Sequence, residues 1–322
     1  MNKVKSIVTG GAGFIGSNLV DKLVKKGHQV TVIDNLSTGR ISNLTHHNKK
    51  NVKIFKVDIS NSKKLKNIFK GHSYIFHLAG LADIVPSIEN PQKYFEANVV
   101  GTLNVLKACK NLKIKKFIYA ASASCYGIPK KYPTKETAKI DIQYPYALTK
   151  FLGEEIVMHW ARLYSMPNLS LRFFNVYGSG QSPEGTYAAV IPKFADLMIK
   201  GIAPTINGDG LNTRDFVHVE DVCEAIMKLI DGEWKSKDYH VYNVATQSKV
   251  TILDIVSEIN NCLINLVSDF KPLNPIHGPE RIGDIRHSTA SIKRITEALE
   301  WTPMVDFKQG INDIVIERLN LM

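Results

Sequence analysis

Short apolar runs alternate with amphipathic segments along the first half of the chain. Between the runs, segments such as Phe14–Lys26 and Tyr94–Lys110 place apolar residues at helical spacing. The apolar runs are bounded by glycine or polar residues and predict buried strands at Val4–Thr9, Gln29–Ile33, Val52–Val57, Tyr74–Leu78 and Phe117–Ala121. This alternation predicts an α/β fold with a doubly wound parallel sheet of the Rossmann type.

The pattern loosens after about Asn175. Residues Gly178–Gly185 are rich in Gly, Ser and Pro and predict a loop. Further helices are expected at Ala188–Lys200, Glu220–Ile230, Ile252–Cys262 and Ala290–Leu299. We therefore predict a nucleotide-binding Rossmann domain over residues 1–172 and a smaller α/β domain over residues 173–322. Segments of about 215–245 are expected to return to the first domain.

The amino-acid composition indicates the class of protein. The 322 residues are 44% hydrophobic and 22% charged, as is usual for globular proteins, and no apolar run is long enough to span a membrane. The N-terminal MNKVKSIVTGG has no signal-peptide pattern, and the four cysteines lack CxxC spacing. We therefore expect a cytoplasmic protein with reduced thiols and no metal site, since the ten histidines also show no ligand spacing.

The formal net charge of +11 raises the question of an anionic partner. The lysines are scattered as singles and as pairs such as Lys25-Lys26, which is typical of solvated helix faces. No basic tract or nucleic-acid motif occurs, so we expect no nucleic-acid partner and no membrane partner. A positive field would still attract a small polyanion such as a nucleotide.

The first predicted strand runs directly into GGAGFIG. Gly10, Gly13 and Gly16 lie at three-residue spacing, and Gly11 completes a GxGxxG pattern with the last two. Glycines at these positions permit a tight turn and let the backbone approach a pyrophosphate, which the positive end of the following helix then attracts. The alternative is an ordinary glycine-rich turn. The strand before it and the helix after it favour a dinucleotide site.

Two acidic residues follow this turn at strand ends. Asp34 lies 18 residues after Gly16, where a carboxylate can bond the adenosine ribose. That carboxylate would repel a 2′-phosphate, which favours NAD over NADP, although nearby Arg40 weakens the preference. Asp58 ends the third strand and could reach the adenine edge. An equally simple alternative is that Asp58 caps the next helix.

The segment QYPYALTK places Tyr146 four residues before Lys150, and residues four apart share a helix face. This pair alone is also typical of a surface helix. Ser122, however, stands at the carboxyl end of the fifth predicted strand, and in open α/β sheets that end faces the ligand crevice. The three side chains can therefore converge on one point.

This combination resembles the extended branch of the short-chain dehydrogenase/reductase superfamily, the NAD-dependent nucleotide-sugar epimerases and dehydratases. The resemblance covers nearly the whole chain. It rests on TGGAGFIGS, DNLSTG, VDI, HLAG, NVVGT, SASCYG, PYALTK, LRFFNVYG, TRDFVHVED and RIGDIRHS. It implies that the cofactor is NAD.

The resemblance also implies roles for individual residues. Tyr146, rather than the loop residue Tyr144, would be the catalytic acid/base, with Ser122 orienting the reacting hydroxyl. Lys150 would hold the nicotinamide ribose and lower the pKa of the phenol. Cofactor contacts are implied for Gly10, Gly13, Phe14, Ile15, Gly16, Asp34, Asn35, Thr38, Gly39, Asp58, Ile59, Leu78, Ala79, Asn98, Tyr146 and Lys150.

The same resemblance assigns the substrate side. Arg214 and Arg281 would neutralise phosphates and Asp284 would bond a ribose hydroxyl, although each could instead form a surface ion pair. Ser288 would leave room beside the sugar for an N-acetyl group, or else it caps a helix that begins near Ala290. The full implied set is Ser122, Ser124, Asn175, Ala189, Val190, Arg214, Arg281, Asp284 and Ser288.

The absence of an acidic pair of residues indicates the type of reaction. The family's dehydratases carry an Asp-Glu pair where this chain has Ala123 and Ser124, neither of which can act as that acid or base. We therefore expect a UDP-sugar 4-epimerase. Ala82 stands where UDP-galactose epimerases often have lysine, and GTYAAVIPK, INGDG and RHS resemble epimerases of N-acetylated sugars. The expected pair is UDP-GlcNAc and UDP-GalNAc, with UDP-Glc and UDP-Gal second.

Two alternatives remain open at this point. One is an epimerase or decarboxylase of UDP-glucuronate, and the other is a non-catalytic NAD-binding protein on the same fold. We also expect a homodimer, because the family often packs two helices of each subunit into a four-helix bundle. Here these would be roughly Tyr94–Lys110 and Tyr146–Tyr164.

Overall fold

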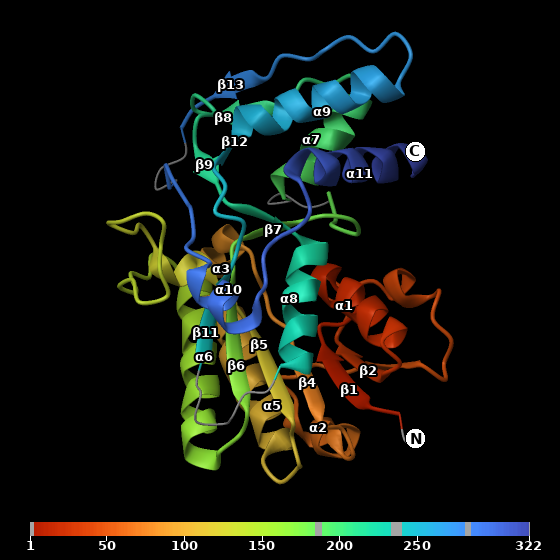
Figure 1. Ribbon diagram of the computed structural model, residues 1–322, viewed down its shortest axis with the longest axis vertical. Coiled ribbons are helices and arrows are strands. Elements are labelled where there is room, and N and C mark those ends of the chain that lie inside the picture. The colour runs from red at the N-terminus through yellow and green to blue at the C-terminus, as the bar shows by residue number, and fades with distance from the viewer. Residues whose placement is uncertain (1–2, 184–188, 233–239, 281–284, 322) are drawn as a thin grey trace.

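A parallel sheet forms the centre of the molecule (Figure 1). The computed structural model describes residues 3–183, 189–232, 240–280 and 285–321. Within them the central sheet has seven strands in the order β11-β6-β5-β4-β1-β2-β3, and every neighbouring pair is parallel. The strands are β1 (Lys5–Thr9), β2 (Gln29–Asp34), β3 (Val52–Lys56), β4 (Tyr74–His77), β5 (Lys116–Ser122), β6 (Asn168–Phe173) and β11 (His240–Val244). The predicted doubly wound α/β fold is confirmed.

The order in which the chain adds strands to the sheet reverses between β1 and β4. From β1 the chain proceeds to β2 and β3 on one side, and from β4 it proceeds to β5, β6 and β11 on the other. A crevice at the carboxyl ends of the strands forms at such a switch point, and this is where ligands bind in doubly wound sheets. The glycine turn after β1 and the end of β4 both lie at this switch point.

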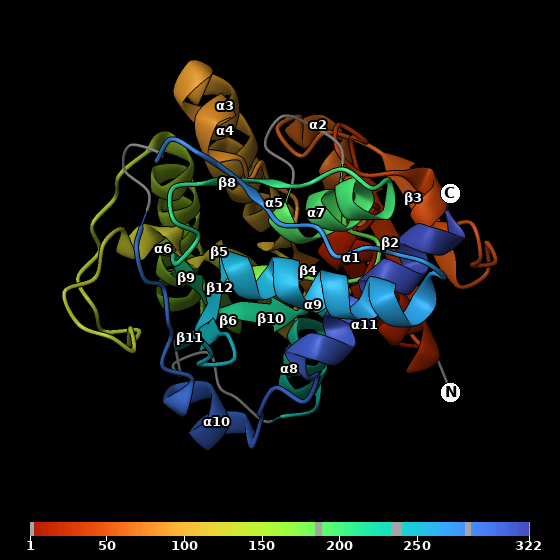
Figure 2. The same ribbon diagram turned by 90° about the horizontal axis from the view of Figure 1, so that it is seen from above.

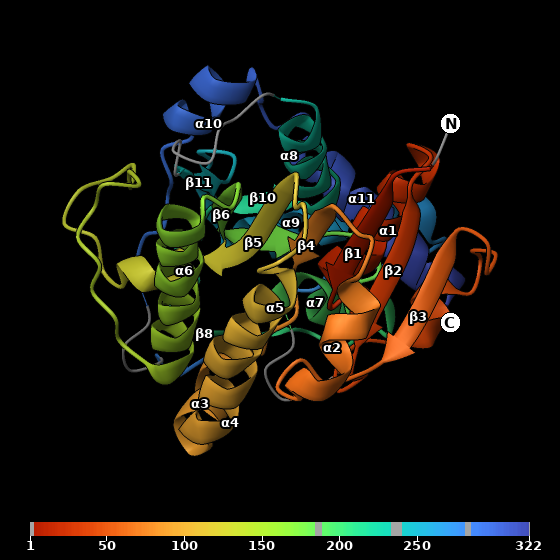
Figure 3. The same ribbon diagram turned by 90° about the horizontal axis from the view of Figure 1, so that it is seen from below.

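Helices cover both faces of the sheet, as Figure 3 shows from below. One face carries α1 (Phe14–Lys25) and α8 (Val219–Asp231), and the other carries α2 (Ser62–Phe69), α5 (Gly101–Cys109) and α6 (Pro145–Tyr164). The short α10 (Lys293–Leu299) packs beside β11. Strand β11 and helix α8 thus join the central sheet region, although the division into two domains stays a prediction.

The sequence pattern missed β6 and misjudged one helix. Strand β6 is buried throughout although Asn168, Ser170 and Arg172 are polar, and each of these side chains forms a hydrogen bond with α6. The helix expected at Tyr94–Lys110 is instead α4 (Pro91–Phe95), a π-helical turn η2 (Glu96–Val100) and α5, preceded by α3 (Ile84–Glu89). Such π turns occur often at functional sites.

The remaining elements lie beyond the carboxyl ends of the strands (Figure 2). Helices α7 (Val190–Ile199), α9 (Ile252–Leu266) and α11 (Phe307–Asn320) pack around an apolar core that includes Phe194, Ile259 and Val315. Three small sheets pair β7 (Asn175–Tyr177) with β10 (Phe216–His218), β9 (Thr213–Arg214) with β12 (Val250–Thr251), and β8 (Thr205–Asn207) with β13 (Ile276–Gly278). Among the described residues, no helix combines the length and the apolar character that crossing a membrane requires.

Candidate active site

The glycine turn after β1 is shaped for the close approach of a ligand. Gly10 has φ +71°, and a Cβ there would lie 2.7 Å from the backbone N of Ala79. A Cβ on Gly16 would lie 2.1 Å from the carbonyl oxygen of Gly10, so only glycine lets α1 start this close to the strand. Gly13, the N-cap of α1, makes no side-chain capping bond, and the first turn of α1 carries no acidic residue. The turn therefore fits a pyrophosphate, and this chain can hold a dinucleotide there.

A pocket opens beside this turn at the carboxyl ends of β1, β2, β3 and β4. Asp34 is buried beside it, and its carboxylate accepts hydrogen bonds from the backbone N–H of Ala12 at 3.0 Å and of Leu36 at 2.8 Å. Those bonds fix the carboxylate in place at the pocket wall. Most of the predicted cofactor residues line this pocket, namely Gly10, Gly13, Phe14, Ile15, Gly16, Asp34, Asn35, Thr38, Asp58, Ile59, Leu78 and Ala79.

Asp58 lines the pocket and does not cap a helix. The N-cap of α2 is Asn61, whose side chain accepts a hydrogen bond from the backbone of Lys63. The Asp58 carboxylate instead accepts hydrogen bonds from Ser60 and, at 2.7 Å, from the side chain of Asn35. Burial raises the pKa of Asp58, but these hydrogen bonds outweigh it and hold the pKa below its ordinary value. Asp58 therefore links the ends of β2 and β3 as a carboxylate.

Asn98 and Gly39, two of the predicted cofactor residues, are not among the residues that line this pocket. The Asn98 amide accepts a hydrogen bond from Leu81 N at 2.8 Å, and it donates to Leu81 O and to Thr149 Oγ1 at 3.0 Å each. Asn98 thus ties the segment after β4 to α6. Gly39 leaves room for the Asp34 carboxylate, because a Cβ there would approach it to 2.9 Å. Direct contact of either residue with the cofactor stays a prediction.

A second pocket adjoins the first, and Ala82 lines both. Ser122 and Tyr146 both lie in its wall, and the Ser122 hydroxyl is near enough to the Tyr146 phenol to affect its pKa. Ser122 also accepts a hydrogen bond from Ser124 N at 3.2 Å, as the N-cap of the short helix η3 (Ala123–Tyr126). The structure therefore brings the strand-end serine and the helical tyrosine together, as the sequence predicts.

The surroundings of Tyr146 shift the pKa of its phenol. In the protein alone, burial raises this pKa above its ordinary value, the Ser122 hydroxyl opposes the rise, and nearby Asp83 adds to it. Burial thus outweighs the groups that lower the pKa of this phenol in the protein, and the lowering of that pKa by Lys150 stays a prediction.

Lys150 is buried one helical turn after Tyr146. Its Nζ lies 4.6 Å from the centre of the Tyr119 ring, a cation–π distance. Burial lowers the pKa of Lys150 to about 8, and Glu154 opposes the shift. Glu154 in turn forms a buried ion pair with Arg172, whose Nη1 donates to the Tyr126 hydroxyl at 2.9 Å. This network fixes α6, with Tyr146 and Lys150 on it, against β6 and η3.

The second pocket holds only part of the predicted substrate set. Ser122, Ser124, Asn175, Arg214 and Ser288 line it. Ala189 is the N-cap of α7 and Val190 its first residue, and neither lines this pocket. Arg281 and Asp284 lie outside the described residues. The roles of all these residues stay predictions.

Hydrogen bonds with main-chain atoms hold Arg214 and Ser288 in place. Arg214 Nη1 donates to the carbonyl oxygens of Thr213 at 3.0 Å and Ile285 at 2.6 Å, and Ser288 N donates to Thr213 O at 3.1 Å. Helix α10 begins only at Lys293, with Ile292 as its N-cap. The alternative that Ser288 caps a helix is therefore wrong, and the helix start expected at Ala290 is corrected.

The sequence did not point to several residues of this pocket. Tyr144, expected in a loop, is the N-cap of α6, and its ring stacks parallel to that of Tyr146 at a centroid distance of 6.4 Å. Burial raises the pKa of Tyr144 to about 12, so its hydroxyl stays protonated at neutral pH. The pocket is also lined by Tyr126, Thr134, Phe173, Phe174 and His287. The sequence offered only an indirect indication, because Phe173 and Phe174 directly precede Asn175, which was predicted to bind the substrate.

Known proteins resemble this chain in sequence and in fold over most of its length. The model of the NAD dependent epimerase/dehydratase family matches residues 6–245. A putative UDP-glucose 4-epimerase of Methanocaldococcus jannaschii is 35% identical, with 96% of each chain covered. The structure of UDP-N-acetylglucosamine 4-epimerase from Methanobrevibacter ruminantium, in complex with UDP-N-acetylmuramic acid, gives a TM-score of 0.92 at 35% identity, with 100% of each chain covered. That of Thermus thermophilus UDP-glucose 4-epimerase in complex with NAD gives 0.86 at 31% identity, covering 99% of this chain and 100% of the other.

Proposed function

The chain belongs to the NAD-dependent epimerase/dehydratase family, and from this premise we propose that it is a UDP-sugar 4-epimerase that interconverts UDP-GlcNAc and UDP-GalNAc. UDP-Glc and UDP-Gal form the second pair. The carrying observation is the pairing of Ser122 with Tyr146 in a pocket that adjoins the dinucleotide pocket. The described lining of that pocket contains no Asp or Glu, so the acid pair of the family's dehydratases has no counterpart there.

Each residue has a chemical task in this proposal. Tyr146 removes the proton from the sugar 4-hydroxyl and later returns it, while Ser122 orients that hydroxyl by a hydrogen bond. NAD, when bound, accepts a hydride from C4 and gives it back, and its positive nicotinamide favours ionisation of the Tyr146 phenol. The transient 4-keto sugar turns over before its 4-hydroxyl is restored. Lys150 holds the nicotinamide ribose, and Arg214 neutralises the diphosphate of the substrate.

The choice of the acetylated pair rests on the pocket wall. Ser288 and Ala82 are small residues that line it, and in this proposal Ser288 leaves the space beside the sugar. The similarity to the Methanobrevibacter ruminantium UDP-N-acetylglucosamine 4-epimerase supports the same choice. A tyrosine at position 288 would fill the space that an acetamido group needs, which makes Ser288 the size gate of the proposal.

A panel of UDP-sugars tests the proposal. The protein, loaded with NAD, is incubated separately with UDP-GlcNAc, UDP-Glc and UDP-glucuronate, and the products are resolved by anion-exchange chromatography. We expect UDP-GalNAc as the fastest-forming product and UDP-Gal as the second. A UDP-pentose formed from UDP-glucuronate would instead establish a decarboxylase. Absence of any product would leave the non-catalytic NAD-binding protein.

We further propose that two copies associate through α5 and α6. These helices lie side by side on one face of the sheet (Figures 1 and 3). The end of α6 exposes Leu163, and its N-terminal turn exposes Leu148, while Phe95 is exposed at the end of α4. Apolar side chains of this size on adjacent helices are typical of a protein interface, and a second copy with the same face would cover them.

The oligomeric state can be measured directly by size-exclusion chromatography with light scattering. We expect a dimer for the wild-type protein and a monomer for the double variant Phe95→Glu, Leu163→Glu. Ile276→Glu is the matched control, because Ile276 on β13 is as exposed as Leu163, at 58%. A monomeric wild type, or a dimer that survives both charges, would contradict this interface.

A further inference from the structure

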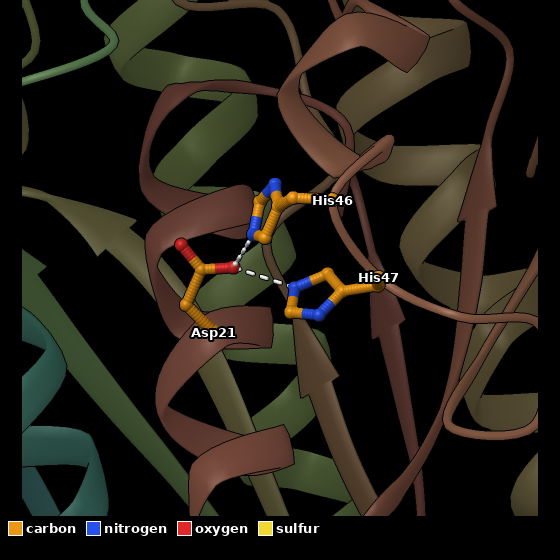
Figure 4. Close-up of side chains that lie close together, drawn as sticks. All are labelled: Asp21, His46 and His47. Carbon is orange, nitrogen blue, oxygen red and sulfur yellow. Dashed lines mark hydrogen bonds and ion pairs between the residues drawn. The ribbon is translucent and has the colours of Figure 1, made fainter.

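Three side chains that play no part in the two pockets converge on the outer side of α1. Asp21 lies on α1, and His46 and His47 lie in the segment between β2 and β3. Both imidazoles reach the same carboxylate oxygen, with Nε2 of His46 at 2.9 Å and Nε2 of His47 at 2.6 Å from Asp21 Oδ1. Figure 4 shows the two rings flanking this oxygen. Two nitrogens and one oxygen are thus gathered at one point of the surface.

The three ligands come from independently anchored elements. Asp21 belongs to a regular helix, so its position is fixed by α1. The histidine segment is held by buried Leu44 at the end of the 3-10 helix η1 (Ile41–Leu44) and by Asn43, whose side chain donates to Ala12 O at 3.0 Å. The histidine segment is therefore anchored next to α1 by the residues that precede the two histidines.

The two imidazole rings lie 4.1 Å apart, centre to centre, and both direct Nε2 towards the same carboxylate oxygen. A cation placed between these atoms would take a lone pair from each imidazole and neutralise the carboxylate at the same time. The three ligand atoms lie within 4.8 Å of one another, and an ion bonded at about 2.0–2.2 Å needs only small side-chain shifts to contact all three.

We propose that Asp21, His46 and His47 bind one divalent first-row transition-metal ion such as Zn²⁺. Two imidazoles with one carboxylate suit these ions, whereas Mg²⁺ and Ca²⁺ prefer oxygen ligands alone. The His47 side chain is 10% exposed, while those of Asp21 and His46 are 47% and 56% exposed. The site is therefore open to solvent on one side, where water completes the coordination and the ion can enter.

The ion would act on structure and not on the reaction, because none of its ligands lines either pocket. It would join α1 to the segment that follows the cofactor residues Asn35, Thr38 and Gly39. This site differs from the expectation of no metal site, because adjacent histidines are not a spaced ligand motif and Asp21 lies 25 residues before His46.

The test is metal binding by untagged, chelator-treated protein, because a polyhistidine tag would add a competing site. Zn²⁺ affinity and stoichiometry are measured by calorimetry, and Co²⁺ is added to record its visible absorption bands. We expect one ion per chain with micromolar or tighter affinity. The variants Asp21→Asn and His47→Gln should each weaken binding at least ~10-fold. Their circular dichroism should match that of the wild type.

His277→Gln is the matched control, since it removes an exposed histidine from β13 and should leave Zn²⁺ affinity unchanged. Equal affinity of Asp21→Asn, His47→Gln and the wild type would overturn the proposal and show binding elsewhere. Wild-type affinity weaker than about 1 mM would do the same. The three side chains would then form hydrogen-bonded pairs only.

Discussion

The two adjoining pockets have the same cavity volume, about 270 Å³ each, but they are built in different ways. The dinucleotide pocket is formed where consecutive strands of one sheet end, and backbone atoms and glycines set much of its shape. The substrate pocket collects side chains from η3, the start of α6, the end of β6 and the segment 285–288. Backbone therefore defines one pocket and side chains define the other.

This difference determines what a substitution can do. In the dinucleotide pocket, an added methyl group meets main-chain atoms that cannot move without shifting a strand or a helix. In the substrate pocket, a changed side chain alters the space offered to one sugar and leaves the frame intact. We therefore expect changes in the first pocket to remove cofactor binding, and changes in the second to alter substrate choice.

The largest effect is expected where the two pockets meet. Tyr146→Phe removes one hydroxyl, keeps the packing of the ring, and should lower kcat at least ~10²-fold, because general acid–base catalysis is lost. The bound NAD content should stay that of the wild type. Initial rates with UDP-GlcNAc and the absorbance of released NAD measure the two quantities. Activity within a few-fold of wild type would show that Tyr146 only packs in the pocket wall and is not the acid/base.

Gly16→Ala should disrupt the dinucleotide pocket, whose shape is set by backbone atoms. The new Cβ would lie 2.1 Å from the Gly10 carbonyl oxygen, and displacing packed backbone costs about 1–3 kcal/mol, or roughly 5- to 150-fold in affinity for NAD. Gly278→Ala is the matched control on β13, because its Cβ would stand 3.5 Å from its nearest neighbour. Calorimetric titration with NAD should separate the two. Equal NAD affinity of both variants would remove the distinction between the pockets.

Ser288→Tyr tests how a side chain of the substrate pocket sets substrate choice. A phenol ring in the substrate pocket should clash with the acetamido group and lower kcat/KM for UDP-GlcNAc at least ~10-fold, while UDP-Glc is turned over as before. NAD affinity should not change. Ser288→Ala, which keeps the space, is expected to handle both sugars. If the tyrosine variant accepts UDP-GlcNAc as well as the wild type does, Ser288 does not set the size of the sugar.

The smallest effect concerns the stability of the dinucleotide half. His77 is fully buried between Thr9 and Thr102, with hydrogen bonds of 2.7 and 2.9 Å, and burial lowers its pKa from 6.5 to about 3. Below pH 6.5 the unfolded chain takes up a proton that the folded protein does not bind. Stability is therefore lost as pH falls from 6.5 towards 3, at up to ~1.4 kcal/mol per pH unit.

Urea unfolding at pH 7.5 and pH 5 measures this loss. His77→Gln should be less stable at both values, because it disturbs two hydrogen bonds, but the difference between the two pH values should shrink. His277→Gln removes an exposed histidine and should leave the difference unchanged. An unaltered pH dependence in His77→Gln would show that another group causes the acid destabilisation.

The contrast between the pockets also explains what the sequence could predict. The glycine turn, Asp34 and five of the seven strands follow from local spacing, because neighbouring residues decide them. Strand β6 was missed because partners such as Glu154 on α6 satisfy its buried polar residues. The π turn around Asn98 likewise depends on contacts with Leu81 and Thr149, which are distant in the sequence.

The substrate pocket shows the same limit more strongly. Ser122, Tyr146 and Ser288 were named from motifs, but nothing local indicates that Tyr144 stacks beside Tyr146 or that His287 lines the same cavity. These positions are fixed by how loops from separate elements meet. Sequence patterns predict the parts of a site that the backbone builds, and they leave undetermined most of what assembled side chains build.

The central claim is that the hydrogen removed from the sugar C4 returns to the same carbon. Turnover of UDP-GlcNAc labelled with deuterium at C4, in ordinary water with NAD-loaded protein, tests it most directly. We expect UDP-GalNAc to retain the label at C4, as read by NMR and mass spectrometry, with no net oxidation of the sugar. Loss of deuterium to water, or accumulation of a 4-keto-6-deoxy sugar, would contradict it.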